Sequence, residues 1–253
     1  MEISSTLDQS NILQEKSKSP SKLKKFGRKA LIGLIGFIVL FVVVDRIWVA
    51  SGSNQWVLKQ EEKGIKIYTL KTPGASIIKV KAVKNFNMTL SNIIAPFLDE
   101  TIQDDCAAWV EGCLEYRILK PWNPKLQTNL QMWRIELPAP LSPREMLVQG
   151  QIYQNPDTKV VTLENLAAPN NIEPSEGFVR IRHFHNIWHY TPLANGEVIV
   201  ELVQDFDMSG FFPDFLLNLA GPSQLFKMFD EELPELLGRE KYVNTTLDFI
   251  EEL

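Results

Sequence analysis

An uninterrupted apolar segment near the N-terminus constrains this chain more than any other feature. Residues Ala30–Val44 are apolar without exception, and a second apolar run, Ile47–Ala50, follows the Asp45–Arg46 pair. A helix needs about 20 residues to cross the hydrocarbon core of a bilayer, a length that the segment reaches when it is counted through Ala50. Trp48 then lies near the interface that indole rings favour. We therefore predict a single-pass transmembrane anchor over residues 30–50.

The residues before this segment predict its orientation. Residues 16–29 carry seven basic side chains and no acidic one, and we expect residues 1–29 to form a disordered basic tail. Basic flanks stay on the cytoplasmic side, which places the N-terminus in the cytoplasm and the globular body on the opposite side of the membrane. The alternative is a cleaved signal peptide, with a secreted or periplasmic body, although the cleavage pattern at Val49–Ala50–Ser51 is weak.

The body differs in charge from the tail. From Ser51 onward, 18 Lys and Arg residues stand against 27 Asp and Glu residues, a net charge of −9. Such a balance argues against nucleic acid as a partner, because that binding depends on displacing phosphate counterions with cations. The two cysteines, Cys106 and Cys113, match no common zinc spacing. We expect two small, partly buried hydrophobic side chains, with pairing left open if the body lies in an oxidising compartment.

Periodicity in the body predicts an α+β domain. A short helix is expected over Asn54–Glu62, a kinked helix over Thr89–Asp99 with Thr89 as its N-cap, and a long apolar helix after Gly210, interrupted at Gly221–Pro222 and Pro234. Between them lie alternating or apolar runs that are typical of strands. The predicted strands are Ile65–Leu70, Ser76–Asn85, Cys113–Lys120, Gln127–Leu137, Met146–Gln154, Lys159–Leu166, Phe178–Tyr190 and Glu197–Phe206. Together they indicate a curved antiparallel sheet with a long helix at its C-terminal end.

Several short motifs occur in a fixed order along the body. They are Gly64–Tyr68 (GIKIY), Trp109, Trp133 followed by Arg144–Glu145, Gly177–Arg180 (GFVR), and Asp207–Pro213 (DMSGFFP) followed by Leu217–Asn218. Taken in this order, the body resembles the START (steroidogenic-acute-regulatory-related lipid transfer) domain family. The resemblance implies the helix-grip fold, in which the curved sheet wraps around the C-terminal helix and encloses a lipid-sized tunnel. It assigns a START-like lipid-binding domain to residues 53–240, followed by a C-terminal helical extension over 241–253.

Four positions depart from the family's pattern. Glu145 replaces an aspartate, Phe215 replaces the tryptophan that opens the last helix, and Val110 replaces the aspartate after the family tryptophan. Cys106 stands where phosphatidylcholine-binding members place part of a headgroup site. The resemblance therefore does not extend to that headgroup specificity.

The resemblance and the strand and helix periods together name candidate lipid contacts. Family positions give Trp133, Ile135, Phe184, Asn186 and Leu219, while strand alternation adds Trp188 and helical spacing adds Leu216 and Phe226. Burying apolar lipid surface gains about 25 cal/mol per Å², and one or two polar groups orient such a ligand. Asn186 suits a neutral hydrogen bond, and ordinary core packing is the alternative for each aromatic residue.

Strand alternation leaves the environment of Arg180 and Arg182 open. Both have the parity of Phe184 and Trp188, so on a concave face they would need partners such as Glu201 or Asp205, whereas on a convex face water would solvate them. Register across the last two strands decides between these readings.

The sequence gives little support to catalysis. His183, His185 and His189 share a face of one strand, but His189 is about 13 Å along the strand from His185, too far to share a zinc ion. No phosphate loop, G-x-S-x-G or H-E-x-x-H motif occurs, so we expect no metal and no cofactor. We predict a membrane-tethered domain that binds or transfers one hydrophobic ligand and whose C-terminal helix and adjacent loops gate the cavity. The alternatives are a helix-grip enzyme using Asp205, Glu201 or a histidine, and an interaction protein with a filled cavity.

Overall fold

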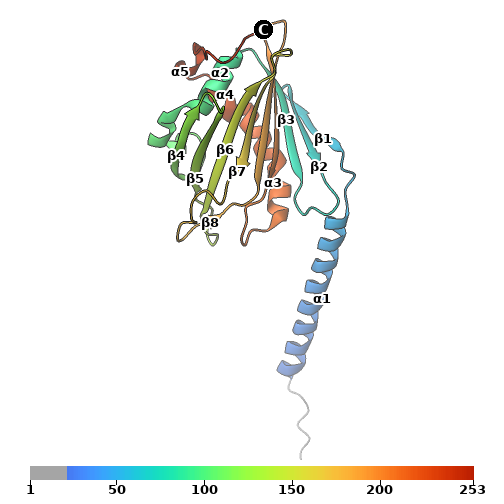
Figure 1. The fold of residues 1–253 in the computed structure, drawn as a ribbon. Helices are drawn as coiled ribbons and strands as arrows, with labels where there is room; N and C mark the ends of the chain where they lie inside the picture. Colours follow the sequence, from blue (N-terminus) through green and yellow to red (C-terminus); the bar gives the residue numbers. More distant parts are fainter. Residues whose placement is uncertain (1–21) are drawn as a thin grey trace, which may run out of the picture. The chain divides into compact units, whose positions relative to one another are not determined.

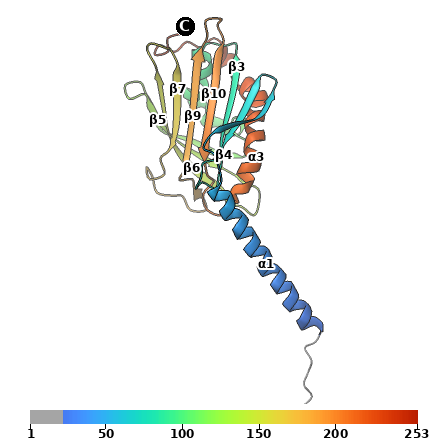
Figure 2. The ribbon, with the colours of Figure 1, turned by 90° about the vertical axis from the view of Figure 1, so that its right-hand side faces the viewer.

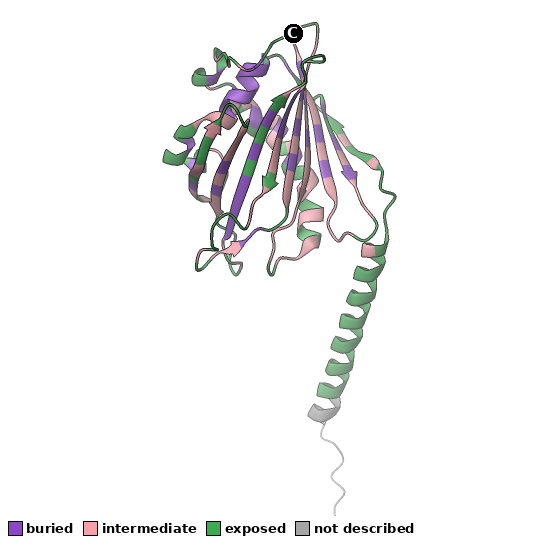
Figure 3. Cartoon of the chain, in the orientation of Figure 1, coloured by how far each residue is buried: buried purple, intermediate pink, exposed green. Residues whose placement is uncertain are grey.

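The N-terminal helix is a structural unit of its own. The computed structural model describes residues 22–253, and the chain divides into two compact units after Ile47, each of which is described by itself. Helix α1 spans Lys22–Ala50, and its stretch Phe26–Ala50 is long and apolar enough to cross a membrane. Figure 3 shows residues 26–48 of this helix exposed. Because α1 begins at Lys22, residues 22–29 of the predicted tail are helical, whereas residues 1–21 lie outside the described residues.

The second unit is built on one large curved sheet. Nine of its ten strands form an antiparallel series in the order β1-β2-β3-β10-β9-β7-β6-β5-β4, and the short β8 pairs in parallel with β6 (Figure 1). The strands are β1 Trp56–Glu62, β2 Ile65–Leu70, β3 Lys79–Phe86, β4 Cys113–Asn123, β5 Thr128–Ile135, β6 Arg144–Gln154, β7 Val161–Ala167, β8 Val179–Arg180, β9 Phe184–Pro192 and β10 Val198–Phe206.

Helices cover one face of this sheet. Helix α3, Asp214–Lys227, packs against β2 and β3 and lies along the sheet in Figures 1 and 2. It continues through a π-helical turn, Met228–Glu232, into α4, Leu233–Leu237, and a last short helix, α5, spans Glu240–Val243. Helix α2, Leu90–Ile94, and three 3₁₀ turns, Ala95–Leu98, Glu100–Asp104 and Cys106–Ala108, link β3 to β4.

The main core lies between the helices and the face of the sheet that they cover, which we call the inner face. Ile67 of β2, Val200 of β10 and Tyr190 of β9 are fully buried there, together with Phe229 and Leu237 from the helical side. Alternation along each strand sends every second side chain to this face. The architecture confirms the predicted α+β fold with a large antiparallel sheet and a C-terminal helix.

Three predicted elements are wrong in detail. Residues 54–62 were expected to be helical, but β1 forms a hairpin with β2 because Lys63 and Gly64 both adopt positive φ, as a two-residue turn requires. The predicted strand over 178–190 is broken into β8 and β9. Of residues 241–253, expected to be helical, only the part in α5 forms a helix.

The predicted start of α2 is confirmed, whereas the predicted break at Gly221–Pro222 is wrong. Thr89 does cap α2, since its hydroxyl accepts a hydrogen bond from the backbone N–H of Asn92 at 3.2 Å. Gly221–Pro222 does not interrupt the last helix, because both residues lie inside α3. The irregularity comes later, where the N–H of Leu233 donates to the carbonyl of Met228 and the helix takes a wider turn.

Candidate functional site: an internal cavity

A cavity of about 770 Å³ lies between the inner face of the sheet and the segment that joins α3 to α4. Its volume falls in the range of ligand-binding cavities. Three aromatic side chains form part of its wall: Trp133 packs on Tyr116 with ring centroids 4.3 Å apart, and Trp188 is backed by Phe229 of the main core, on which it stacks at 6.0 Å. The interior of the domain is therefore hollow, with large apolar side chains facing the space.

Five of the eight predicted contact residues line this cavity. Trp133 and Ile135 come from β5, and Phe184, Asn186 and Trp188 come from β9. Each set alternates along its strand, so all five side chains reach the same face. Trp188 is also part of the main core and is almost fully buried.

The other three predicted residues do not line it. Leu219 is 76% exposed and Leu216 is 38% exposed, both on the outward side of α3, while Phe226 is half-buried against the main core. Helical spacing groups residues into stripes, but it does not say which stripe faces the cavity. Here α3 packs on β2 and β3, and only its last residue, Lys227, and the residues after it reach the cavity.

Sequence reasoning missed much of the lining. Strands β6 and β7 supply Met146, Val148, Gly150, Ile152, Leu163 and Asn165, and the helical side supplies Met228, Leu233 and Leu236. Alternation within the predicted strands could have found the β6 and β7 residues once one inner position was known. The sequence pattern contains no signal that predicts the π-helical turn.

The exposed lining residues show where the cavity reaches solvent. They lie on the loop 107–112 and on the helical segment 227–235. The ends of the loop are joined by a disulfide between Cys106 and Cys113, so the expectation of two unpaired small hydrophobic residues is wrong. Arg239 donates from Nη2 to the carbonyl of Ala108 at 3.0 Å and links the loop to the helical side.

Charged side chains of the lining occur at this rim and not in the interior. Among the described residues, the charged members of the lining are Glu111, Lys227, Glu232, Glu235 and Arg239. All but the half-buried Arg239 are exposed, and Lys227 pairs with Glu232 at 3.2 Å. The interior is lined by apolar and amide side chains.

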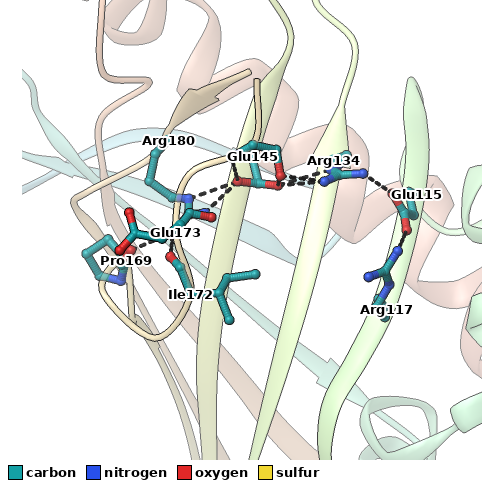
Figure 4. Close-up of polar contacts among 9 residues, drawn as sticks. Glu115, Arg117, Arg134, Glu145, Pro169, Ile172, Glu173 and Arg180 are labelled. Carbon is teal, nitrogen blue, oxygen red and sulfur yellow. Dashed lines mark hydrogen bonds and ion pairs between the residues drawn. The ribbon is translucent and has the colours of Figure 1, made fainter. Parts of the chain in front are cut away.

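The opposite face of the same strands carries a buried ion network. Glu145 of β6 is fully buried and accepts hydrogen bonds from Arg180 at 2.6 Å, from Arg134 at 3.0 Å and from the hydroxyl of Ser175 at 2.6 Å (Figure 4). Arg134 also pairs with Glu115 on β4. Trp133 and Met146, the strand neighbours of Arg134 and Glu145, face the cavity, so the network lies behind the cavity wall.

These contacts decide the ionisation of Glu145. Burial alone would raise the pKa of its carboxyl group, but the hydrogen bonds from Ser175, Arg180 and Arg134 outweigh it and lower the pKa to about 2. The guanidinium of Arg180 also donates to the carbonyls of Ile172 and Glu173, which anchors the loop before β8. Neither alternative left open by the sequence describes Arg180, which is buried and pairs with Glu145 instead of Glu201 or Asp205, because the break before β9 removes it from the alternation of that strand. Arg182 is exposed, as the solvated alternative expects.

The neighbouring Arg144 holds a different loop. It is 2% exposed and donates to the carbonyls of Met208 at 2.6 Å and Ser209 at 3.2 Å. Burial lowers the pKa of its guanidinium. The Arg144–Glu145 motif thus fixes the two loops that lead into β8 and into α3.

The candidate catalytic residues lie outside the cavity. Asp205 pairs with Lys79 at 2.6 Å and with His183 at 2.8 Å, and Glu201 pairs with Lys81 at 3.4 Å. None of these side chains belongs to the lining. The remaining histidines bond to neighbours on β7, His185 to Glu164 and His189 to Thr162.

The sequence of this chain is similar to those of known proteins. Residues 48–236 match the START domain family. An uncharacterized protein of Pseudomonas aeruginosa is 23% identical over 189 residues, which cover 74% of this chain and 89% of that protein.

Solved structures share the fold at low sequence identity. The STAR-related lipid transfer protein of Xanthomonas axonopodis superposes with a TM-score of 0.62 at 19% identity, covering 72% of this chain and 98% of that fragment. Human STARD10 gives a TM-score of 0.63 at 10% identity, covering 90% of this chain and 84% of its own.

Proposed function

The chain belongs to the START domain family, and from this premise we propose that its globular domain holds one lipid molecule in the cavity while α1 tethers the domain to a membrane. The observation that carries the proposal is the hollow interior, about 770 Å³ in volume and walled by Trp133, Trp188 and other apolar side chains. Removing apolar lipid surface from water gains about 25 cal/mol per Å², so such a wall favours a hydrophobic guest.

The N-terminal helix supports the tether. The 25 residues of Phe26–Ala50 suffice for a membrane span. A tether raises the local concentration of the domain at the bilayer, which suits transfer over short distances. A cleaved signal sequence is the competing reading of the same helix.

The disulfide supports a domain outside the cytoplasm. Disulfides persist in oxidising compartments and are rare where thiols are kept reduced, and Cys106–Cys113 is the pair at the cavity rim. With the basic residues on the cytoplasmic side of α1, the domain would lie across the membrane. In intact cells, a thiol-reactive label should then modify the full chain only after reduction; labelling without reductant would contradict this topology.

The rim supports a gate between the loop 107–112 and the helical segment 227–239. Lipid entry needs an opening, and the exposed lining residues gather at these two segments. The π-helical turn adjoins the rim, and such turns are rare in helices and frequently occur at functional sites. We infer that motion of these segments admits the ligand.

Plugging the cavity tests lipid binding directly. We expect the full chain, purified with its native lipids, to carry about one lipid per protein by mass spectrometry, and the variant Val148→Trp to carry far less because its indole would occupy the cavity. Gln149→Trp, one residue along β6 on the exposed face, is the matched control and should retain lipid. Ile135→Trp plugs another part of the lining if Val148→Trp folds poorly. A native chain without lipid, or plugged variants that fold and carry as much as the control, would overturn the proposal.

We advance no enzymatic function. A catalytic use of the cavity would need an acid or base in contact with the ligand, whereas the carboxylates of Asp205 and Glu201 are paired with cations on the opposite face of β10. Gln204 and Leu202, their strand neighbours, have inner-face positions.

A further inference from the structure

A row of amide side chains crosses the cavity wall at one level. In the pairing register of the sheet, Asn129 of β5 lies opposite Gly150 of β6, Gly150 opposite Asn165 of β7, Asn165 opposite Asn186 of β9, and Asn186 opposite Gln204 of β10. All five residues line the cavity. Four amides from four strands therefore form one polar band, which we call the amide row, in a wall whose other strand residues are apolar except Gln131.

Gly150 makes room for this row. Its φ is not in the positive region, so the backbone itself does not require glycine. A Cβ atom added there would lie 2.5 Å from Oδ1 of Asn129 and 3.1 Å from Oδ1 of Asn165. The two amides thus approach each other across a position where a side chain would displace them.

Two acceptors of the row are unpaired. Among the described residues, Oδ1 of Asn129 and Oδ1 of Asn186 are buried without any hydrogen-bond partner. Burying a polar atom without a partner is unfavourable, and a hydrogen-bond donor from a bound molecule would remove that penalty. Because both residues line one cavity, a single ligand can serve both.

The charge distribution restricts the ligand. The charged members of the described lining lie at the rim, with three carboxylates against two cations, and Arg134 and Arg180 are engaged by Glu145 behind the wall. A phosphate or carboxylate placed against the amide row would be buried without a cation, which is strongly unfavourable. Neutral hydroxyl and amide groups match the row because each side-chain amide both donates and accepts hydrogen bonds.

We propose that the amide row is the polar subsite for an uncharged lipid bearing hydroxyl or amide N–H groups, and that the cavity selects such a lipid over a phospholipid. This inference rests on the proposed function, since it names the class of lipid that the same cavity holds. The hydroxyl or N–H groups would donate to Asn129 and Asn186, and the acyl chains would lie against the aromatic wall.

Photo-crosslinking of the full chain in lipid vesicles tests the selection. The probes are diacylglycerol, phosphatidylcholine and phosphatidylglycerol with the same diazirine-bearing acyl chain, and only crosslinks to peptides from β5, β6, β7 and β9 are counted, so that labelling of α1 is ignored. We expect diacylglycerol to label these peptides at least tenfold more than either phospholipid. Equal labelling, or preference for a phospholipid, overturns the inference while leaving the proposed function in place. No crosslink from any probe to these peptides overturns both.

Substitution of the row separates its role from that of the wall. Asn186→Leu keeps a similar volume but removes the hydrogen bond, so diacylglycerol labelling should fall about fivefold, while the weak phospholipid labelling should not fall. Gly150→Ala should act in the same direction by displacing Asn129. Gln151→Leu, an amide on the exposed face of β6, is the matched control and should change nothing. Unchanged diacylglycerol preference in both Asn186→Leu and Gly150→Ala overturns the inference.

Discussion

The two faces of strands β5 and β6 use polar side chains in opposite ways. On the outer face, Glu145 is fully buried, and both of its carboxylate oxygens accept hydrogen bonds (Figure 4). The donors are Arg134, Arg180 and Ser175. On the inner face, Asn129 of the same sheet presents a buried oxygen with no partner among the described residues. Most buried polar groups are paired, so an unpaired one needs an explanation. The outer face has its polar groups fully paired within the structure, whereas the inner face leaves an acceptor open to the cavity.

Removing the central carboxylate should have the largest effect. Glu145→Gln leaves Arg180 and Arg134 as buried cations without their shared anion, and breaking such a pair costs about 3–5 kcal/mol. The free energy of unfolding of the full chain, from denaturant titration, should fall by that amount. Glu115→Gln, at the half-exposed end of the network, is the control and should cost less than about 1 kcal/mol. A loss for Glu145→Gln as small as that of the control would show that the outer face does not depend on the network.

Acid should weaken the same face. The pKa of Glu145 is lowered from its ordinary 4.5 to about 2 in the folded state, so its contribution is complete above pH 4.5 and is lost as the pH falls through 2. This shift corresponds to about 3 kcal/mol of stability. The difference in unfolding free energy between the native chain and Glu145→Gln should therefore shrink between pH 5 and pH 2. A difference that stays constant over this range would contradict the assignment.

Opening the rim should have an intermediate effect. Replacing both cysteines, Cys106→Ser with Cys113→Ser, releases the short loop that they close and should lower the free energy of unfolding by about 2 kcal/mol. Because the loop forms part of the rim, the exchange of a fluorescent lipid between the domain and vesicles should also become faster. Addition of a reductant to the native chain should reproduce both changes, and a reductant should leave the double variant unaffected. A lower free energy of unfolding without faster lipid exchange would show that the loop is not part of the gate.

The smallest effect should have the opposite sign. Asn186→Leu removes a buried, unpaired oxygen from the inner face, so the lipid-free chain should become more stable by about 1 kcal/mol. The Tm of the lipid-free chain, measured by circular dichroism, should rise, whereas the extra stability gained on adding diacylglycerol should shrink. A lower Tm for the lipid-free variant would show that Asn186 belongs with the structural polar groups of the outer face.

The sequence predicted the fold better than the site. Alternation located most of the strands within a few residues, and Thr89 marked the start of α2. The helix predicted over residues 54–62 was wrong, because pairing with β2 through the Lys63–Gly64 turn overrode a weak helical pattern. Propensity is local, and a hairpin partner supplies energy that a single segment does not reveal.

The site depended on information between strands. Trp133 and Asn186 were found on family positions, but Asn165 and Gly150 join them only through the register of β6, β7 and β9. Leu219 was misplaced because the packing of α3 on β2 and β3, and not its apolar stripe, decides which side meets the cavity. Long-range register and helix docking are set by the whole core, which no short window contains.

The wider helical turn at Met228–Glu232 determines in which direction the side chains of the following helix point. An α-helix rotates by about 100° per residue, so the additional residue in this turn swings Leu233 and Leu236 around the axis by that angle compared with an unbroken α-helix. Those two side chains face the cavity. Deleting a single residue between 228 and 232 would therefore restore a regular helix while turning that part of the wall away from the cavity, even though every leucine of the wall is kept.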